Sequence, residues 1–120
     1  MAAAAKTAAS KAAPARAGMS RVAASPCTAI VTYRVQAEDI DTFLEAWDQA
    51  NAYLKKQAGH VSSTLHGAVS ANPYFRFVNV AKWKSADDFR KATQSAAYIA
   101  AAGRLEAYPV YGSVYESVRG

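Results

Sequence analysis

The chain has 120 residues, 52% of them hydrophobic and 19% charged, and its net charge at pH 7 is +5. A chain of this length holds one domain with a modest core. The basic charge lies mainly in residues 1–26, which carry four Lys or Arg and no acid, whereas residues 27–120 carry ten Lys or Arg against nine acids. The domain is therefore nearly neutral and has no basic stripe, so we expect no nucleic-acid binding.

Residues 1–26 form an Ala-rich segment of low complexity, with twelve alanines and several Ser and Pro residues. This composition is typical of a disordered tail, and we place the folded domain at residues 27–120. A basic, acid-free, Ala-rich tail is also typical of an organelle transit peptide, so organelle targeting stays open beside a cytoplasmic location. No stretch approaches the roughly 18 apolar residues of a membrane span, and we expect no membrane association.

Cys27 is the only cysteine in the sequence. A single cysteine excludes an intramolecular disulfide and a thiolate metal cluster, and it fits a reducing compartment such as the cytoplasm. Cys27 has no neighbouring base in sequence, so a role as nucleophile is not expected. We predict no metal site.

The first half of the domain predicts a strand, a helix and the start of a hairpin. Residues 29–36 alternate between two faces, as a strand does. Residues 39–57 follow with apolar side chains at helical spacing, acids at the start and Gly59 as a stop. Residues 60–66 alternate again, and a turn-rich connection leads to a third strand at residues 74–83.

The second half predicts two helical segments and a last strand. Ser85 begins a sequence that resembles a capping box, and a second short helix at residues 95–107 is interrupted near Gly103. Residues 109–118 alternate as the final strand. The order β-α-β-β-α-β predicts a ferredoxin-like α+β fold, an antiparallel sheet with its helices on one face.

The sheet face away from the helices should carry apolar side chains. Val78 and Val80 lie on that face of the third strand, and the other strands add alternate apolar positions. Exposing an apolar patch of this size to water is unfavourable, so we expect a second copy of the chain to cover it, as in a dimeric α+β barrel. Tyr108, Tyr111 and Tyr115 are candidates for the contact with the partner.

The third strand predicts a pocket wall. Its other face reads Phe75, Phe77, Asn79, Ala81 and Trp83. An amide within an aromatic row is costly to bury without a hydrogen bond, and the indole N–H also needs a partner. The alternatives are that Asn79 binds backbone or a buried water, and that Trp83 is a core or dimer-contact aromatic.

Segments 77–85 (FVNVAKWKS) and 59–66 (GHVSSTLH) resemble the antibiotic biosynthesis monooxygenase family of dimeric α+β barrels, over about residues 28–118. The resemblance implies that Asn79 and Trp83 are pocket residues, as in the cofactor-independent anthrone oxygenases of that family. A pocket Tyr of those enzymes falls on Phe89, which lacks the hydroxyl, and a pocket Arg corresponds to Arg104. Pairing of Arg104 with a nearby carboxylate is the alternative.

The haem-degrading branch of the same superfamily uses an axial His on the helix after the Trp. Thr93 and Gln94 stand at the nearest positions here, and neither binds iron in that way. We therefore expect no haem and no other cofactor.

The predicted function is a cofactor-independent monooxygenase that oxidises an anthrone- or quinol-type aromatic with dioxygen. The aromatic rings of the third strand would hold the substrate ring, and Asn79 with Trp83 would donate to a developing oxyanion. His66 or a Tyr would accept the proton, although the register leaves the face of His66 open. The alternative, favoured by Phe89, is a non-catalytic or stress-linked ligand-binding dimer.

Overall fold

The computed structural model describes residues 24–120, so the tail predicted for residues 1–26 lies almost wholly outside the described part of the chain. The elements, in chain order, are β1 (Cys27–Tyr33), the 3-10 turn η1 (Ala37–Asp39), α3 (Ile40–Leu54), β2 (His60–Gly67), β3 (Phe77–Trp83), α4 (Ala86–Gln94), α5 (Ala96–Ala101), η2 (Gly103–Ala107) and β4 (Val110–Tyr115). The predicted order of elements is confirmed.

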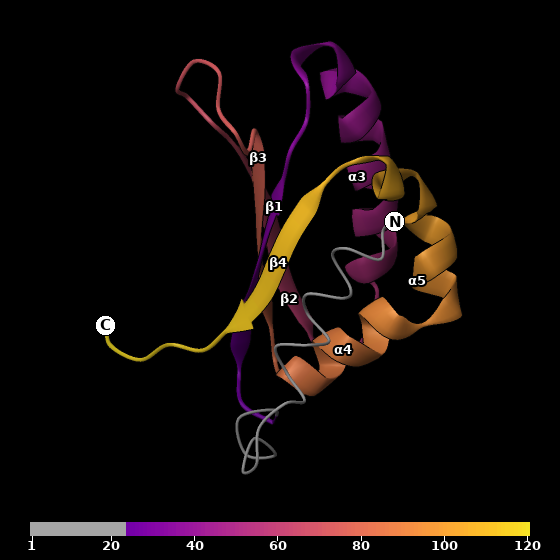
Figure 1. The fold of residues 1–120 in the computed structure, drawn as a ribbon. Coiled ribbons are helices and arrows are strands. Elements are labelled where there is room, and N and C mark those ends of the chain that lie inside the picture. Colours follow the sequence, from indigo (N-terminus) through magenta and orange to yellow (C-terminus); the bar gives the residue numbers. More distant parts are fainter. Residues whose placement is uncertain (1–23) are drawn as a thin grey trace.

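The four strands form one antiparallel sheet in the order β2-β3-β1-β4. The helices all lie on one side of it, to the right in Figure 1. This is the predicted ferredoxin-like α+β fold, with the first strand in the centre and the hairpin of β2 and β3 along one edge. None of the helices within residues 24–120 is long and apolar enough to cross a membrane.

Local signals explain where the helices begin and end. Ser85 caps α4, as predicted, because its hydroxyl accepts a hydrogen bond from the Asp88 backbone N–H at 3.0 Å. Asp39, at the start of α3, makes no such bond, so the acids there favour the helix through its dipole alone. After α3, Gly59 has φ +89, and this left-handed residue turns the chain into β2.

The core is divided into two clusters between the sheet and the helices. The larger one centres on Phe43 of α3, whose ring lies 4.9 Å from Tyr33, 4.9 Å from Phe77 and 5.2 Å from Tyr108. The smaller cluster surrounds Trp83 at the other end of the sheet. Tyr108 was predicted at the partner contact; that prediction is wrong, because η2 directs the ring back onto Phe43.

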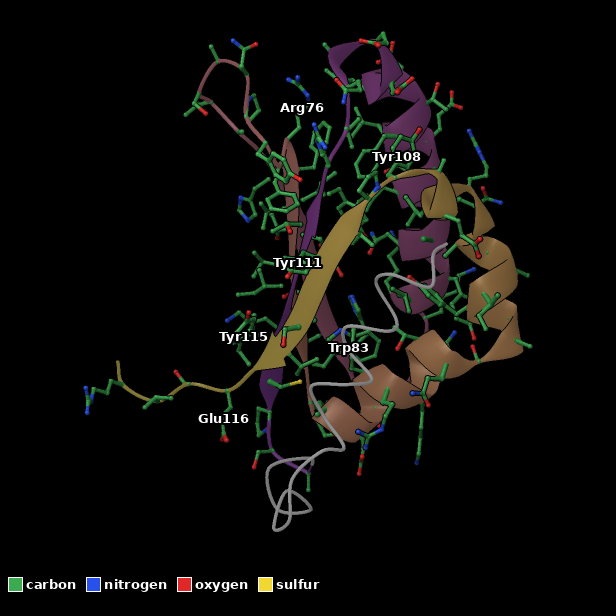
Figure 2. All side chains as sticks on the ribbon, in the orientation of Figure 1. Arg76, Trp83, Tyr108, Tyr111, Tyr115 and Glu116 are labelled. Carbon is green, nitrogen blue, oxygen red and sulfur yellow. The ribbon has the colours of Figure 1, made fainter. Side chains whose placement is uncertain are left out.

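None of the helices within residues 24–120 covers the other face of the sheet, here called the open face. Thr32 lies opposite both Val78 and Tyr111 on this face. Tyr111 is 72% exposed and Tyr115 52% exposed, and both point away from the helices in Figure 2. Apolar side chains thus alternate on the open face as the sequence predicted.

The third strand begins later than predicted, at Phe77. Tyr33 lies opposite Phe77, while its carbonyl accepts the Arg76 backbone N–H at 3.0 Å. Tyr74 and Phe75 form a bend before the strand, so the alternation of β3 does not extend to Phe75. Phe75 consequently stacks near Tyr111, with ring centroids 6.2 Å apart, on the open face. The prediction that Phe75 shares a face with Asn79 is therefore wrong.

Candidate active site

A small cavity lies between the sheet and the helices, close to the larger core cluster. Its volume is about 30 Å³, which is room for about two water molecules. Strands β1 and β3 form its floor, and α3, α4, α5 and η2 form its walls. The lining side chains are Val31, Tyr33, Trp47, Ala50, Asn51, Leu54, Asn79, Phe89, Thr93, Tyr98 and Leu105.

Asn79 is the polar group at the floor of this cavity. It lies in the middle of β3, opposite Val31 and Leu65, and is 9% exposed. Its Oδ1 atom is buried and has no hydrogen-bond partner among the described residues. An unsatisfied buried acceptor costs about 1–3 kcal/mol, so this oxygen is free to accept a hydrogen bond from a molecule in the cavity.

Two tyrosines, Tyr33 of β1 and Tyr98 of α5, are among the residues that line the cavity. Burial raises the pKa of Tyr98 to about 12. Burial is also the main reason that the pKa of Tyr33 is raised, with the nearby Tyr98 as a second cause. Both hydroxyls therefore stay protonated at neutral pH and can donate hydrogen bonds.

Helix α4 contributes Phe89 and Thr93. Phe89 lines the cavity, where the resemblance placed it. Thr93 is buried, and its hydroxyl donates to the Phe89 carbonyl at 2.9 Å. The Thr93 hydroxyl is therefore already engaged in a hydrogen bond within α4.

Within residues 24–120, no charged side chain is part of the lining. Among these described residues, none of the Asp, Glu, His, Lys and Arg side chains is placed in the cavity wall to take a proton from a molecule bound there. Within residues 24–120, no group of three or more His, Cys, Asp or Glu side chains is placed to hold a metal ion. The chemistry that the cavity walls offer is stacking on aromatic rings and hydrogen bonding to neutral groups.

Trp83 lies beside this cavity but is not part of its lining. It is 1% exposed, and its Nε1 has no hydrogen-bond partner among the described residues. The indole ring packs against Phe89 at 5.6 Å and against His60 at 5.1 Å between centroids. Trp83 and Asn79 do share the helix-facing side of β3, as predicted, and Figure 2 places Trp83 on that side. Phe89 lies between Trp83 and the cavity, because it packs against the indole and lines the cavity.

His60 sits at the outer side of this indole. Its Nε2 atom lies 2.7 Å from the Ser63 hydroxyl. Partial burial, and to a lesser extent Lys55, lowers the pKa of His60, so the ring is neutral at pH 7.

The model of the antibiotic biosynthesis monooxygenase family matches residues 26–104. The chain belongs to this family. No curated protein sequence matches the chain at a significant level. Membership of the antibiotic biosynthesis monooxygenase family supports a monooxygenase-like role in general terms.

Three solved structures illustrate the similarity of fold. A candidate monooxygenase from Shewanella loihica PV-4 is 27% identical, with a TM-score of 0.71, over 80% of this chain and 97% of that one. SnoaB, a cofactor-independent oxygenase from Streptomyces nogalater, is 21% identical, with a TM-score of 0.68, over 81% and 97%. A dimeric protein of ferredoxin-like fold from Bacteroides fragilis NCTC 9343 is 14% identical, with a TM-score of 0.63, over 77% and 96%.

Two residues that the family resemblance or the strand pattern suggested lie away from the cavity. His66 pairs with Val78, so its exposed side chain projects from the open face, opposite to Asn79. Arg104 lies on η2 with its guanidinium at the surface, 3.3 Å from a carboxylate oxygen of Glu45. The structure brings neither side chain to the cavity, so the predictions of a His66 base and an Arg104 substrate contact are wrong.

Phe77 stays on the helix-facing side but packs into the core. Its ring stacks on Phe43 with an interplanar angle of 14°, and it is not among the cavity-lining side chains. Of the seven predicted site residues, Asn79 and Phe89 meet at the cavity.

The sequence prediction missed the tyrosines. Tyr33 stood in the alternation of the first strand, and Tyr98 stood among apolar residues of a short helix. A signal was available for Tyr33, since a Tyr on the buried face of a central strand needs a partner for its hydroxyl. Trp47 of α3 packs against the larger core cluster and lines the cavity as well.

Proposed function

We propose that this protein is a cofactor-independent monooxygenase that oxidises an electron-rich aromatic substrate, of the anthrone or quinol type, with dioxygen. The observation that carries the proposal is the unpaired Asn79 oxygen in a cavity walled by aromatic rings. Membership of the antibiotic biosynthesis monooxygenase family supports the class of reaction. SnoaB, a relative in fold, is a cofactor-independent oxygenase.

The reaction balances without an external reductant. When an anthrone is oxidised, its ring CH₂ carbon becomes a ketone carbon. One oxygen atom of dioxygen enters the ketone, and the other leaves as water with the two hydrogen atoms. The substrate supplies all four electrons, so the protein has to bind the ring and favour its enolic anion.

In this proposal, hydrogen-bond donors of the cavity wall stabilise the enolic anion of the substrate, and no side chain acts as the base. The two tyrosine hydroxyls remain protonated and can donate to a developing oxyanion, which is the contribution of an oxyanion hole. The described residues place no carboxylate, imidazole or amine in the lining, so we assign the proton acceptor to solvent. In this proposal Trp83 is a positioning residue, because it holds Phe89 against the cavity.

The cavity has to enlarge to admit an aromatic ring, since its present volume fits about two water molecules. Helix α5 is the wall best able to move. It has six residues and none of them is buried, although Tyr98 projects from it into the cavity wall. We propose that α5 swings outward between Ser95 and Gly103 when the substrate enters.

We further propose that the protein is a homodimer that joins through the open face. Ile30, Val78 and Val80 are partly exposed there, beside the more exposed Tyr111 and Tyr115. The relative from Bacteroides fragilis is dimeric, and it has the same fold. The cytoplasmic location stays a prediction, and the buried free thiol of Cys27 fits it.

A ligand-binding protein without catalysis is the second candidate. It is favoured by the lining, to which residues 24–120 contribute no Asp, Glu, His, Lys or Arg side chain, and by Phe89, which has no hydroxyl. A binding protein needs the same shape and the same hydrogen bonds, but no means of favouring an anion.

The experiment that separates the two candidates is dioxygen uptake by metal-stripped protein with a panel of anthrones and hydroquinones. We expect uptake with a clear substrate preference, which Asn79→Ala should lose. Gln49→Ala is the matched control, since it removes an exposed amide from α3. Uptake no faster than the spontaneous reaction would rule out the oxygenase and leave the binding protein.

A further inference from the structure

We propose that this protein binds a phosphate group in a second site, a polar hollow at the end of the sheet, here called the arginine hollow. Its volume is about 260 Å³. It is lined by residues 34–36, which follow β1, and by Asn72, Pro73, Tyr74 and Arg76 of the loop before β3. None of these residues lines the candidate active site, so the inference goes beyond the proposed function.

The Arg76 guanidinium is fixed at the wall of the arginine hollow. Its Nε–H donates to the Val35 carbonyl at 2.9 Å, and Val35 itself lines the hollow. The Arg76 backbone N–H donates to the Tyr33 carbonyl at 3.0 Å, so the backbone is anchored as well. Figure 2 shows Arg76 near the end of the sheet from which the loop before β3 extends. The Nη1 and Nη2 donors have no partner among the described residues, so they are available to a ligand.

The Arg34 guanidinium is held by an aromatic ring. Its Cζ atom lies 4.4 Å from the ring centroid of Tyr74, which is a cation–π contact, and Tyr74 lines the arginine hollow too. Tyr74 in turn packs edge-to-face against Phe75, with 4.8 Å between ring centroids. Because both arginines are held before a ligand arrives, less side-chain entropy is lost on binding.

The described residues supply no carboxylate to neutralise these two cations. The ion pairs within residues 24–120 are Arg90 with Asp87 and Arg104 with Glu45. Neither Asp nor Glu is among the residues that line the arginine hollow. Two positive charges at one hollow repel each other, and an anion bound between them removes this repulsion.

A phosphate group fits this set of donors better than a carboxylate does. A phosphate monoester has three acceptor oxygens and nearly two negative charges at pH 7, whereas a carboxylate has two oxygens and one charge. A guanidinium can donate two parallel hydrogen bonds to a phosphate, so two guanidinium groups can engage all three oxygens. Gln36 and Asn72, whose side chains carry amide donors, line the same hollow.

The phosphate can be free or can belong to a small organic monoester. Tyr74 is 64% exposed at the edge of the arginine hollow, so part of its ring is accessible to the organic part of a monoester. A comparison of inorganic phosphate with phenyl phosphate therefore distinguishes the two sources.

The test titrates inorganic phosphate, phenyl phosphate and acetate into the ¹⁵N-labelled full chain at pH 7. The ionic strength is kept constant with sodium chloride, so that general screening does not change. The arginine Nε–H signals and the backbone amides of Gln36 and Arg76 report binding. We expect both phosphates to bind at least about tenfold more tightly than acetate. Tighter binding of phenyl phosphate than of inorganic phosphate would support a monoester, and equal affinity would support free phosphate.

Two variants test the arginines. Arg34→Gln should weaken phosphate binding at least about tenfold, because it removes a charged donor. Arg76→Lys should do the same although it keeps the charge, because an ammonium group lacks the planar fork of donors. Arg104→Gln is the matched control. It removes one positive charge from η2, away from the arginine hollow, and should leave the affinity unchanged.

Phosphate that shifts none of these signals would overturn the proposal, whether the hollow is empty or is filled by a carboxylate of a second copy. Acetate that binds as tightly as phosphate would overturn it as well. Equal weakening in Arg34→Gln and Arg104→Gln would show that net charge alone attracts the anion, and would also overturn it. Arg34→Gln should keep its dioxygen uptake, since Arg34 does not line the candidate active site.

Discussion

Asn79 is a buried polar side chain that the fold does not need for its own hydrogen bonds. Leu has nearly the same shape and no polar atom, so Asn79→Leu should raise the free energy of unfolding by about 1 kcal/mol. The same variant should lose dioxygen uptake. Urea denaturation measured beside the uptake assay checks both. A variant less stable than wild type would show that Asn79 has a structural role.

Gly59 is a second residue at which one atom matters. Its φ of +89 is unfavourable for any residue with a side chain, and a Cβ there would lie 2.4 Å from the Asp88 side chain. Gly59→Ala should therefore cost about 2 kcal/mol, as seen for non-glycine residues in strained backbone regions. Urea denaturation measures this loss.

Gly103→Ala is the matched control for that substitution. A Cβ at Gly103 meets no atom within 4 Å and the backbone there is not left-handed, so stability should stay equal or rise slightly. Equal losses of unfolding free energy in Gly59→Ala and Gly103→Ala would mean that the left-handed turn after α3 is not the cause of the lower stability.

At the scale of elements, α5 depends on Ser95 for its attachment. The Ser95 hydroxyl accepts the Tyr98 backbone N–H at 3.1 Å and donates to the Ala92 carbonyl at 2.9 Å. It also lies 3.0 Å from the Tyr53 hydroxyl of α3. This hydrogen bond between Tyr53 and Ser95 connects the junction of α4 and α5 to α3.

Tyr53→Phe removes that bond and keeps the ring. We expect faster amide hydrogen exchange in α5, by an amount equivalent to about 1 kcal/mol, with little change in α4. Mass spectrometry of exchanged peptides measures it, and Tyr74→Phe, at an exposed ring in the loop before β3, is the control. If amide exchange in α5 is unchanged in Tyr53→Phe, the hydrogen bond between Tyr53 and Ser95 does not limit the opening of α5. That result would count against the proposal that α5 is the wall that moves.

The elements themselves were predictable because their signals are local. Ser85 and Gly59 mark helix ends within a few residues of sequence, and alternation identified all four strands. The site was less predictable because it depends on long-range contacts. The chain before β3 is held by a hydrogen bond from the Arg76 N–H to the carbonyl of Tyr33, 43 positions earlier, and Phe75, in the bend next to it, lies on the open face beside Tyr111. Tyr98 reaches the cavity through the packing of α5, which no local pattern encodes.

At the scale of the whole molecule, the open face is where the proposed dimer joins. Val80 lies near its centre, opposite Ile30 of β1 and Thr64 of β2. Val80→Lys places a charge where the proposed partner packs, so the variant should run as a monomer while the wild-type protein runs as a dimer. Light scattering after gel filtration measures the mass of each.

Gln49→Lys adds the same charge on the helix side and should remain a dimer. If the wild-type protein is monomeric at all tested concentrations, the proposal that it forms a dimer is wrong. If the Val80→Lys protein stays dimeric, the dimer interface does not lie on the open face.

The order of the strands also bears on how the chain folds while it is being made. Strand β1 is synthesised first, yet one of its two neighbours is β4, and the Thr32 hydroxyl donates to the Tyr111 carbonyl across 79 positions of sequence at 3.1 Å. Until residues 110–115 have left the ribosome, the edge of β1 that will receive β4 has unpaired N–H and C=O groups. The nascent chain therefore passes through a stage in which its central strand can pair with the wrong molecule, and protection by a chaperone matters most just before the last strand emerges.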